Sequence, residues 1–514
     1  MQPARFLSID CGTQSLRAFV FDQHGQMLAR SQTVFDPPYH AAEQGWAEQD
    51  PDFYWRVLAE ACQSLWAQGV EPASLKAAAL TTQRGTVVVV DRDGKPLRPA
   101  FLWLDERQAA ELPALPVYWE KLHQVSGHRE TIRKLRLRAQ GNWLAVHEPD
   151  IWRRTSRFLL LSGYLAFRLT GQYRDAVASQ VGYIPFDYKA HRWPAGWDWR
   201  WQALNLTRDK LGDLVPAGGE LGRISPEAAR LTGLPVGLPL IAAGADKACE
   251  VLGAGCVAPW QAALSFGTTA TFNTVTRKFV SINPPMPPYP AVIPGQYCLE
   301  SQIPQGFALV RYFRDQIAAQ ELAAEQESSG EDWLAVLERW LASTPAGAHG
   351  LMWQPGLSVQ ASGESLSRGA LLGLSAQHGK ADWYLALVEG LLYALRDGMH
   401  HVTRHTKQPV SMLFAAGGGA QSAAVMQTAA NVFGAPIHQP HTHETSGLGA
   451  AICAAVGTGI YPDFAEAVRA MSRVERVFYP EAAAAAHYDR LYHHVYRPWV
   501  RALADLYRRE AHNA

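Results

Sequence analysis

The feature that most constrains this chain is a loop of one kind that occurs twice. Residues 10–15 read DCGTQS, and residues 266–271, in the second half, read FGTTAT. Each loop stands between two apolar runs of strand length, so each predicts a hairpin that turns through glycine and hydroxyl residues. Such a turn lets backbone N–H groups crowd around an anion, while the hydroxyl groups add further donors.

A single loop of this composition is more often an ordinary β-turn. Two copies favour a pair of loops that close on one polyphosphate from opposite sides, in a nucleotide cleft between duplicated domains. Asp10 supports this hypothesis, because a carboxylate at the end of an apolar strand needs a cation or hydrogen-bond partners. Mg²⁺ that travels with ATP supplies such a cation.

The composition leaves room for a two-domain enzyme and narrows its partners. At 514 residues the chain is too long for one core. Lys and Arg together number 47, as do Asp and Glu, which argues against nucleic acid or an anionic membrane and favours a small-molecule partner. The six cysteines lack CxxC spacing and the N-terminus leads straight into a strand, so we expect a reduced, cytoplasmic protein. No apolar run reaches the roughly 20 residues that a membrane helix needs, so no membrane span is expected. The sequence is also compatible with a homodimer.

Strands and helices alternate along the chain, which is typical of an α/β protein. Asp50 and Pro51 predict the start of an amphipathic helix. Residues 158–169 have helical spacing that stops at Gly171, so we expect a helix over this segment.

The domain boundary is expected just before the second loop, so that it divides the chain into residues 1–255 and residues 256–514. The second part ends in a helical tail whose apolar stripe predicts packing rather than a site, and Pro498 predicts a kink in it. The stripe consists of Tyr488, Leu491, Tyr492, Val495, Trp499, Leu503 and Leu506.

Several motifs together resemble the FGGY family of carbohydrate kinases, within the wider group that shares the actin and hexokinase ATPase core. Trp383 and Leu387 depart from the family signature, which prefers other apolar residues there. The motifs that carry the resemblance are the opening at 10–17, the segment 369–374 followed by Asp382 and Glu389, and the helix start at 447–451.

The resemblance implies both a fold and a reaction. The fold is α/β, with two actin-like (ribonuclease H-like) domains that hinge over an ATP and substrate cleft. Residues 1–255 would bind the acceptor and carry the catalytic base, and residues 256–514 would bind the nucleotide. The reaction is transfer of the γ-phosphoryl group of ATP to a hydroxyl of a small sugar or polyol, with a ketose such as a pentulose favoured. Glycerol, another polyol or a sugar acid is the alternative acceptor.

Phosphoryl transfer of this kind needs a base for the hydroxyl, and Asp246 is the candidate. It follows the apolar run 238–242 and resembles the family's Gly-x-x-Asp motif. Without the resemblance, Asp246 is more simply the cap of a helix that begins at Lys247. The second hairpin downstream and the family motif favour the role of base.

The same resemblance implies a nucleotide site, in which Asp10 would bind Mg²⁺ directly or through water. The turn at 417–422 lies between an apolar strand and a helix, an arrangement that lets adenosine approach the backbone closely. Taken alone, a glycine-rich turn of this kind is often only a tight connection between a strand and a helix. Asn431 and Ala416 stand where relatives carry Asp. The implied residues are Gly12, Thr13, Gln14, Ser15 and Arg17 in the first loop, Gly267, Thr268 and Thr269 in the second, and Gly417, Gly418, Gly419, Gln421 and Ser422 in the turn.

Residues 82–86 and 103–107 resemble the family's two acceptor-binding segments, whose guanidinium and indole groups suit the hydroxyls and C–H faces of a polyol. In the alternative, Trp103 is a strand core residue and Arg107 a surface ion-pair partner. Gly85 replaces the Glu that glycerol kinases carry, and the His-Gly of xylulose kinases is absent. The implied acceptor residues are Gln83, Arg84, Trp103, Asp105, Asp246 and Lys247.

Lys247 stands beside the candidate base, where relatives often have an uncharged residue. It could lower the pKa of Asp246, bind an anionic acceptor such as a sugar acid, reach a phosphate, or be a solvent-exposed helix lysine. Residues 363–368 look shortened relative to the family, with an effect on acceptor range or on oligomer contacts left open.

Three other interpretations of the sequence are less favoured. His438, His441, His443 and Glu444 have spacing that could gather metal ligands, but structural or adventitious binding is more common than a catalytic metal, so only Mg²⁺ with the nucleotide is expected. A non-catalytic sugar sensor of the same fold would lack Asp246 or a phosphate loop. A chaperone-like ATPase would lack the acceptor segments. This chain has Asp246, both phosphate loops and both acceptor segments, which argues against the two alternatives.

Overall fold

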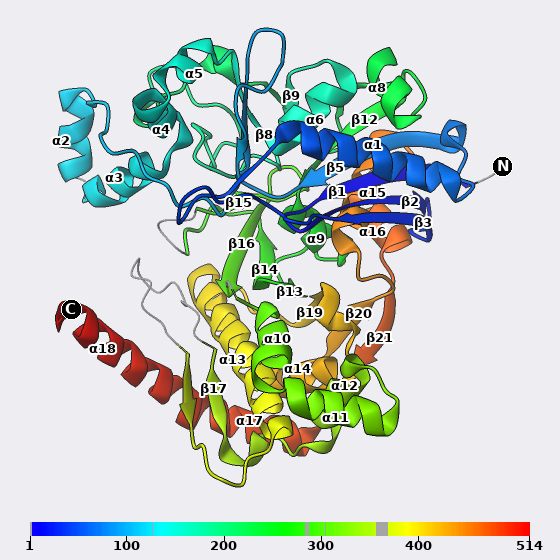
Figure 1. Ribbon diagram of the computed structural model, residues 1–514, viewed down its shortest axis with the longest axis vertical. Helices are drawn as coiled ribbons and strands as arrows, with labels where there is room; N and C mark the ends of the chain where they lie inside the picture. Colours follow the sequence, from blue (N-terminus) through cyan, green and yellow to red (C-terminus); the bar gives the residue numbers. More distant parts are fainter. Residues whose placement is uncertain (1–2, 126, 283–286, 304, 356–368, 514) are drawn as a thin grey trace. The chain divides into compact units, whose positions relative to one another are not determined.

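The computed structural model describes residues 3–125, 127–282, 287–303, 305–355 and 369–513 (Figure 1). The chain forms two compact units, each made from more than one stretch of sequence. Unit 1 comprises Met1–Gly253, Tyr289–Tyr297 and Ser446–Ser472, and unit 2 comprises Ala254–Pro288, Cys298–Thr445 and Arg473–Ala514. Within the described residues, no helix is both long enough and apolar enough to cross a membrane.

The main sheet of unit 1 has the strand order β11-β12-β5-β1-β2-β3. Strand β1 pairs antiparallel with β2 and parallel with β5, and β5 pairs parallel with β12. All but one residue of each of β1 and β5 are buried, as expected for the central strands of a sheet that is covered on both faces. The strands are β1 (Arg5–Cys11), β2 (Ser15–Asp22), β3 (Met27–Val34), β5 (Leu75–Thr82), β11 (Glu220–Arg223) and β12 (Pro239–Ala245).

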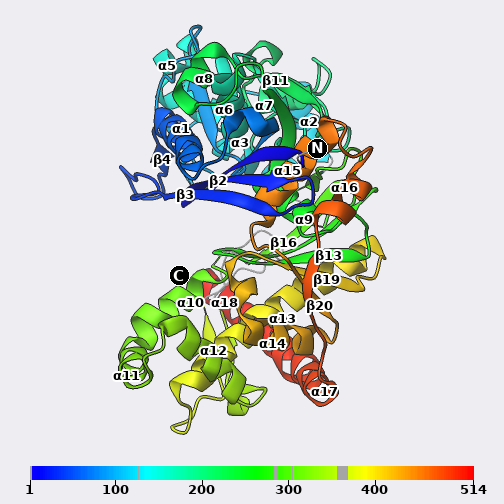
Figure 2. The same ribbon diagram turned by 90° about the vertical axis from the view of Figure 1, so that its right-hand side faces the viewer.

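Helices cover both faces of this sheet, with α1, α6 and α8 on one side and α9, α15 and α16 on the other (Figure 2). Helix α1 begins at Pro51 as predicted, because the Asp52 N–H donates to the Asp50 side chain over 3.0 Å and caps the helix. The helices are α1 (Pro51–Ala67), α6 (Leu161–Thr170), α8 (Pro226–Thr232), α9 (Asp246–Gly253), α15 (Thr445–Gly457) and α16 (Phe464–Met471).

Smaller elements extend unit 1 beside the main sheet. One sheet has the order β4-β7-β6-β8, and β9 pairs parallel with β10. The strands are β4 (Glu48–Gln49), β6 (Val87–Val90), β7 (Ala100–Phe101), β8 (Arg157–Leu160), β9 (Arg174–Ala176) and β10 (Asp213–Val215). The helices are α2 (Val117–Val125), α3 (Arg129–Arg138), α4 (Gln140–His147), α5 (Pro149–Arg154) and α7 (Trp199–Ala203).

The main sheet of unit 2, in the order β15-β16-β14-β13-β19-β20-β21, repeats the plan of unit 1. Strand β13 pairs antiparallel with β14 and parallel with β19, β19 pairs parallel with β20, and β20 pairs antiparallel with β21. The same directions run through β2, β1, β5, β12 and β11, so the predicted duplication of an α/β domain is confirmed. The strands are β13 (Gln261–Phe266), β14 (Ala270–Thr276), β15 (Tyr289–Pro290), β16 (Tyr297–Ile303), β19 (Met412–Ala416), β20 (Ile437–Pro440) and β21 (Val474–Phe478).

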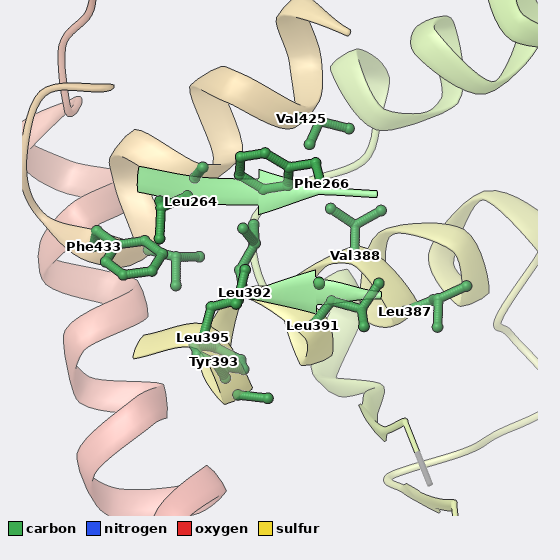
Figure 3. Close-up of a cluster of buried hydrophobic side chains, with 14 of the residues drawn as sticks. Leu264, Phe266, Leu387, Val388, Leu391, Leu392, Tyr393, Leu395, Val425 and Phe433 are labelled. Carbon is green, nitrogen blue, oxygen red and sulfur yellow. The ribbon is translucent and has the colours of Figure 1, made fainter. Parts of the chain in front are cut away.

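The core of unit 2 is organised by α13, a helix that is buried on most of its surface between Tyr384 and Arg396. Leu387, Leu391 and Leu395 pack there with Leu264 of β13 and Phe433 of α14 (Figure 3). A helix that is apolar on nearly all sides belongs in a domain interior. The remaining elements are α10 (Ala308–Tyr312), α11 (Ala319–Ser329), α12 (Trp333–Ser343), α13 (Lys380–Thr406), α14 (Ala423–Phe433), α17 (Ala482–Leu491), α18 (Arg497–Asn513), β17 (Met352–Gln354) and β18 (Ala370–Leu372).

Two local predictions were wrong in part. The segment 158–169 begins as strand β8 and becomes helical only at Leu161, because its first residues pair with β6. The tail is helical, but a π-helical turn over Tyr492–Tyr496 interrupts it ahead of Pro498. Its apolar stripe packs only in its first part, since Leu506 is 57% exposed.

Candidate functional site

The first predicted phosphate loop is the tight connection between β1 and β2. The Gly12 N–H donates to the Ser15 carbonyl over 3.0 Å, which closes the turn. Thr13 and Ser15 are partly exposed and Gln14 is exposed. Hydroxyl, amide and backbone donors therefore gather where an anion can reach them.

Asp10 and Arg17, predicted to bind Mg²⁺ and phosphate, face each other across the β1–β2 ladder. Their side chains form an ion pair of 2.6 Å between the Arg17 guanidinium and Asp10 Oδ2. Asp10 is only 1% exposed, so this pair compensates a carboxylate that would otherwise be costly to bury. Arg17 is more accessible, with 28% of its side chain exposed.

A hydrogen-bonded chain joins the first phosphate loop to both acceptor segments. The Thr13 hydroxyl donates to Gln83 Oε1 over 2.9 Å and accepts from the Trp103 indole N–H, also over 2.9 Å. Gln83 Nε2 in turn donates to the Tyr54 hydroxyl over 3.2 Å. Trp103 is 44% exposed, so the alternative that it is a strand core residue is wrong. Its indole face is available to a sugar.

Asp246 is the first residue of α9 and follows β12 directly. The Lys247 N–H donates to Asp246 Oδ1 over 2.7 Å, and Arg84 Nε lies 3.7 Å from the same oxygen. The end of β12 is held from two sides, because the Thr81 hydroxyl donates to the Gly244 carbonyl and the Ala245 N–H donates to the Ala178 carbonyl. The carboxylate thus bonds to the start of its own helix and also faces a residue of the acceptor segment.

Burial raises the pKa of Asp246 above that of a free aspartate, while Arg84 and then Lys247 act in the opposite direction. The side chain keeps 30% of its surface exposed, so a small molecule can reach it. A carboxylate with raised proton affinity and an open face suits a general base.

Lys247 is not the solvent-exposed helix lysine of one sequence hypothesis. Its Nζ lies 2.9 Å from Glu250 Oε1, and the two side chains are only 15% and 9% exposed. Together with Arg84 and Asp246 they make a group of two cations and two carboxylates. The charge around the candidate base is therefore balanced within unit 1.

Asp105, predicted to bind the acceptor, lies in a buried ion-pair cluster. Its side chain is 2% exposed, accepts from the Ala47 N–H over 2.8 Å, and pairs with Arg107 over 2.6 Å. Arg107 is buried too, stacks 3.7 Å from the Trp46 ring centroid, and pairs with Glu48 over 2.8 Å. The alternative that Arg107 is an ion-pair partner is right, but its location at the surface is wrong, and Asp105 holds the loop that carries Trp103.

The second predicted phosphate loop connects β13 and β14 and is braced by the start of α10. The Phe307 N–H donates to the Gly267 carbonyl over 2.9 Å, and the Ala308 N–H donates to the Thr268 carbonyl over 3.4 Å. Gly306 lies so close behind the loop that a Cβ there would come within 2.2 Å of the Ala270 nitrogen. Backbone contact on this side fixes the loop's shape.

The glycine-rich turn after β19 packs against this second loop within unit 2. Gly417 has φ of +80°, and a Cβ there would meet Phe266 and Gly267 backbone atoms at 3.0 to 3.2 Å. A Cβ on Gly419 would lie 2.8 Å from the Phe307 ring. Only glycine allows both the left-handed backbone and this approach, so the loop and the turn are held as one surface.

Ser422 ends this turn and caps α14, since the Val425 N–H donates to its hydroxyl over 3.0 Å. The sequence reading missed Glu338 of α12, which accepts from the Ser422 hydroxyl and from the Ala424 N–H, the latter over 2.7 Å. Gly306 was missed as well. Neither residue has a local motif, because its partners lie far away in the sequence.

The histidine segment gathers no metal site in the part of the chain that the structure describes, where no group of three or more metal-binding side chains occurs. His443 lies 3.5 Å from Glu444, and His438 Nδ1 lies 3.1 Å from the Leu413 carbonyl. The shortened segment 363–368 falls outside the described residues.

Comparisons with known proteins agree with these observations. Residues 5–253 match the model of the N-terminal domain of the FGGY family of carbohydrate kinases, and residues 262–458 match that of its C-terminal domain. A xylulose kinase of Staphylococcus epidermidis is 27% identical, over 97% of this chain and 98% of its own length. An autoinducer-2 kinase of Enterobacter sp. is 30% identical, over 97% of this chain and 94% of its own. The crystal structure of a ligand-bound xylulose kinase from Lactobacillus acidophilus superposes with a TM-score of 0.82 at 20% identity, covering 98% and 99% of the two chains.

Proposed function

Since the chain belongs to the FGGY family of carbohydrate kinases, we propose that Asp246 is the base with which it phosphorylates an uncharged sugar at the expense of ATP. The observation that carries this proposal is the place of the carboxylate, at the end of a braced strand, partly exposed and 3.7 Å from Arg84. From there Asp246 orients the acceptor hydroxyl and takes its proton as the oxygen attacks the γ-phosphorus, while the bond from that phosphorus to the bridging oxygen breaks and ADP leaves.

We propose candidate nucleotide-binding donors in each unit, taken by itself. In unit 1 the donors are the turn at 12–15 and Arg17, and in unit 2 they are the loop at 267–269 and the turn at 417–422. The close backbone packing in unit 2 supports this assignment, since rigid donors stabilise charge on a moving phosphoryl group without reorganisation. We also propose that residues 1–255 carry the acceptor site and the catalytic base, and that residues 256–514 carry the nucleotide-binding residues other than those of the first loop.

Asp10 fits the Mg²⁺ that accompanies ATP, because it offers carboxylate oxygens, the ligands this ion prefers. One of those oxygens is held by Arg17, so the ion pair keeps the side chain oriented and compensated when no metal is bound. When bound, Mg²⁺ would neutralise charge on the phosphates.

The charges around Asp246 support an uncharged acceptor. Lys247 is committed to Glu250 and Arg84 faces Asp246, so an anionic acceptor would add negative charge to a balanced group. This favours a neutral sugar or polyol over a sugar acid. The xylulose kinase of similar length supports a pentulose, and the autoinducer-2 kinase, at higher identity, makes autoinducer-2 a second acceptor to test. Glycerol is less favoured because Gly85 replaces the Glu of glycerol kinases.

The experiment is an ADP-release assay with Mg²⁺ and ATP across pentuloses, hexuloses, autoinducer-2, glycerol, other polyols and sugar acids, with a control that lacks acceptor. We expect release that depends on a neutral ketose. D246N should bind ATP nearly as the wild type does but lose turnover by about three orders of magnitude or more. Normal turnover of D246N would reject Asp246 as the base, and release without any acceptor would reject the kinase assignment.

A further inference from the structure

A segment from the second half of the chain lies in unit 1. Tyr289–Tyr297, which begins with β15, is grouped with Met1–Gly253 although it falls inside the sequence matched by the C-terminal family model. Its far end is anchored where the Tyr297 hydroxyl donates to the Lys189 carbonyl over 2.7 Å and the ring packs on His191 at 4.6 Å between centroids. The N-terminal stretch alone therefore does not complete unit 1.

The segment meets the candidate acceptor site at two points. Tyr289, which is 1% exposed, lies with its ring centroid 5.1 Å from Cζ of Arg84. Val292 packs on β12 beside Gly244, where an added Cβ would come within 3.2 Å of its Cγ2. Gly244 precedes Asp246 by two residues. The segment thus touches both the arginine that faces the base and the strand that presents it.

We propose that Tyr289 is a positioning residue for the phosphoryl acceptor, which limits the movement of the Arg84 guanidinium beside Asp246. This inference rests on the proposed function, in which Asp246 is the base. An arginine side chain has many rotamers, and a buried aromatic ring restricts them because the planar guanidinium stacks on it. With Arg84 held, its donors point to one place, which an acceptor hydroxyl near Asp246 can use. An arginine without that ring would bind the acceptor in several orientations, of which few are reactive.

The test compares Y289F, which keeps the ring, with Y289L, which keeps apolar bulk but loses the aromatic face. For the acceptor identified in the panel, we expect Y289F to stay within about twofold of the wild type in kcat/KM. We expect Y289L to lose about tenfold in kcat/KM for the acceptor, with the KM for ATP unchanged. If Y289L melts far below the wild type, Y289M replaces it, since a flexible thioether fills irregular space.

A double-mutant cycle shows whether Tyr289 acts through Arg84. R84K keeps the charge and loses the planar group, so adding Y289L to R84K should cost little more than R84K alone. Tyr164 provides the matched control in the same unit. It is fully buried, lies 5.7 Å from Cζ of Arg168, and stands beside the ion pair of Arg168 with Asp52. Y164L should leave kcat/KM for the acceptor unchanged in folded protein.

Equal kcat/KM in folded Y289F and Y289L would overturn the proposal. It would also be overturned if the fold-loss in kcat/KM of the double variant equalled the product of the fold-losses of Y289L and R84K, because the two residues would then act independently. Failure of this inference is distinguishable from failure of the proposed function. D246N with full turnover rejects the base, whereas an inactive D246N together with an unaffected Y289L rejects only the role of Tyr289.

Discussion

Lys247 Nζ and Glu250 Oε1 lie 2.9 Å apart on the first turn of α9, directly after the candidate base. Both side chains are largely buried, so screening by solvent is weaker than for a surface pair. If Asp246 is the base, the ion pair lowers the attraction of Lys247 for an anionic acceptor. We therefore expect Glu250 to influence the choice between charged and neutral acceptors without contacting the sugar.

E250Q should shift this selection. Glu250 contributes to the raised pKa of Asp246, so its neutralisation lowers that pKa. Because the base works only when deprotonated, the acidic limb of kcat/KM should move to lower pH. Sugar acids should gain about tenfold in kcat/KM relative to neutral sugars, measured by ADP release across pH. The control is E220Q, which removes an exposed pair with Arg223 of the same length, 2.9 Å, and should change neither property.

Thr13 should couple the two substrates, because its hydroxyl bonds to both Gln83 and Trp103. T13V keeps the shape but removes the hydroxyl, so we expect the KM for ATP and the KM for the acceptor both to rise, each by about five- to tenfold. T13S retains the hydroxyl and should stay close to the wild type. Steady-state kinetics with each substrate varied in turn provide the check, and a T13V effect on ATP alone would contradict the link.

Gly306 should be needed for the second phosphate loop. A Cβ there would meet the Ala270 nitrogen at 2.2 Å and the Thr269 carbonyl carbon at 2.7 Å, and main-chain atoms cannot move aside cheaply. G306A should therefore displace the loop and raise the KM for ATP by about tenfold or more. At Gly196 nothing lies within 4 Å of an added Cβ, so G196A is the control. Equal ATP affinities of the two variants, by calorimetry, would refute the bracing role.

Glu389 should make unit 2 sensitive to pH. Burial raises the pKa of Glu389 to about 7. The Tyr488 hydroxyl and the Gly347 N–H donate to the carboxylate, and these hydrogen bonds oppose part of the rise. Because the folded pKa lies above the unfolded value, the stabilising contribution is complete at low pH and is lost as pH rises through about 7.

E389Q mimics the protonated acid, so the unfolding free energy of this variant should not show the loss of stability with rising pH that Glu389 causes in the wild type. The difference in unfolding free energy between E389Q and wild type should grow in favour of E389Q from pH 5 to 8, by about 3 kcal/mol at most. Urea unfolding at several pH values measures it. A difference that stays constant with pH would show that Glu389 does not titrate in this range.

Much of the fold could be predicted from local sequence patterns. The two hairpins, the start of α1 at Asp50 and the place of Asp246 between strand and helix depend on neighbours within a few residues, which the sequence displays directly. The Lys247 and Glu250 pair could also have been found, because residues three apart on a helix are neighbours. The segment 158–169 was misassigned because its helical spacing is the same whether or not a partner strand takes its first residues.

Short motifs and periodicity were enough to predict the duplicated α/β plan, its repeated loops and the family. The ion pair of Arg17 with Asp10, the burial of Asp105 with Arg107, and the packing of Tyr289 on Arg84 became visible only in the folded chain. Burial and ion pairing depend on which side chains the fold brings together, and local sequence patterns do not display this. Tyr289 and Arg84 come from opposite halves of the chain, so no local sequence pattern predicts their contact.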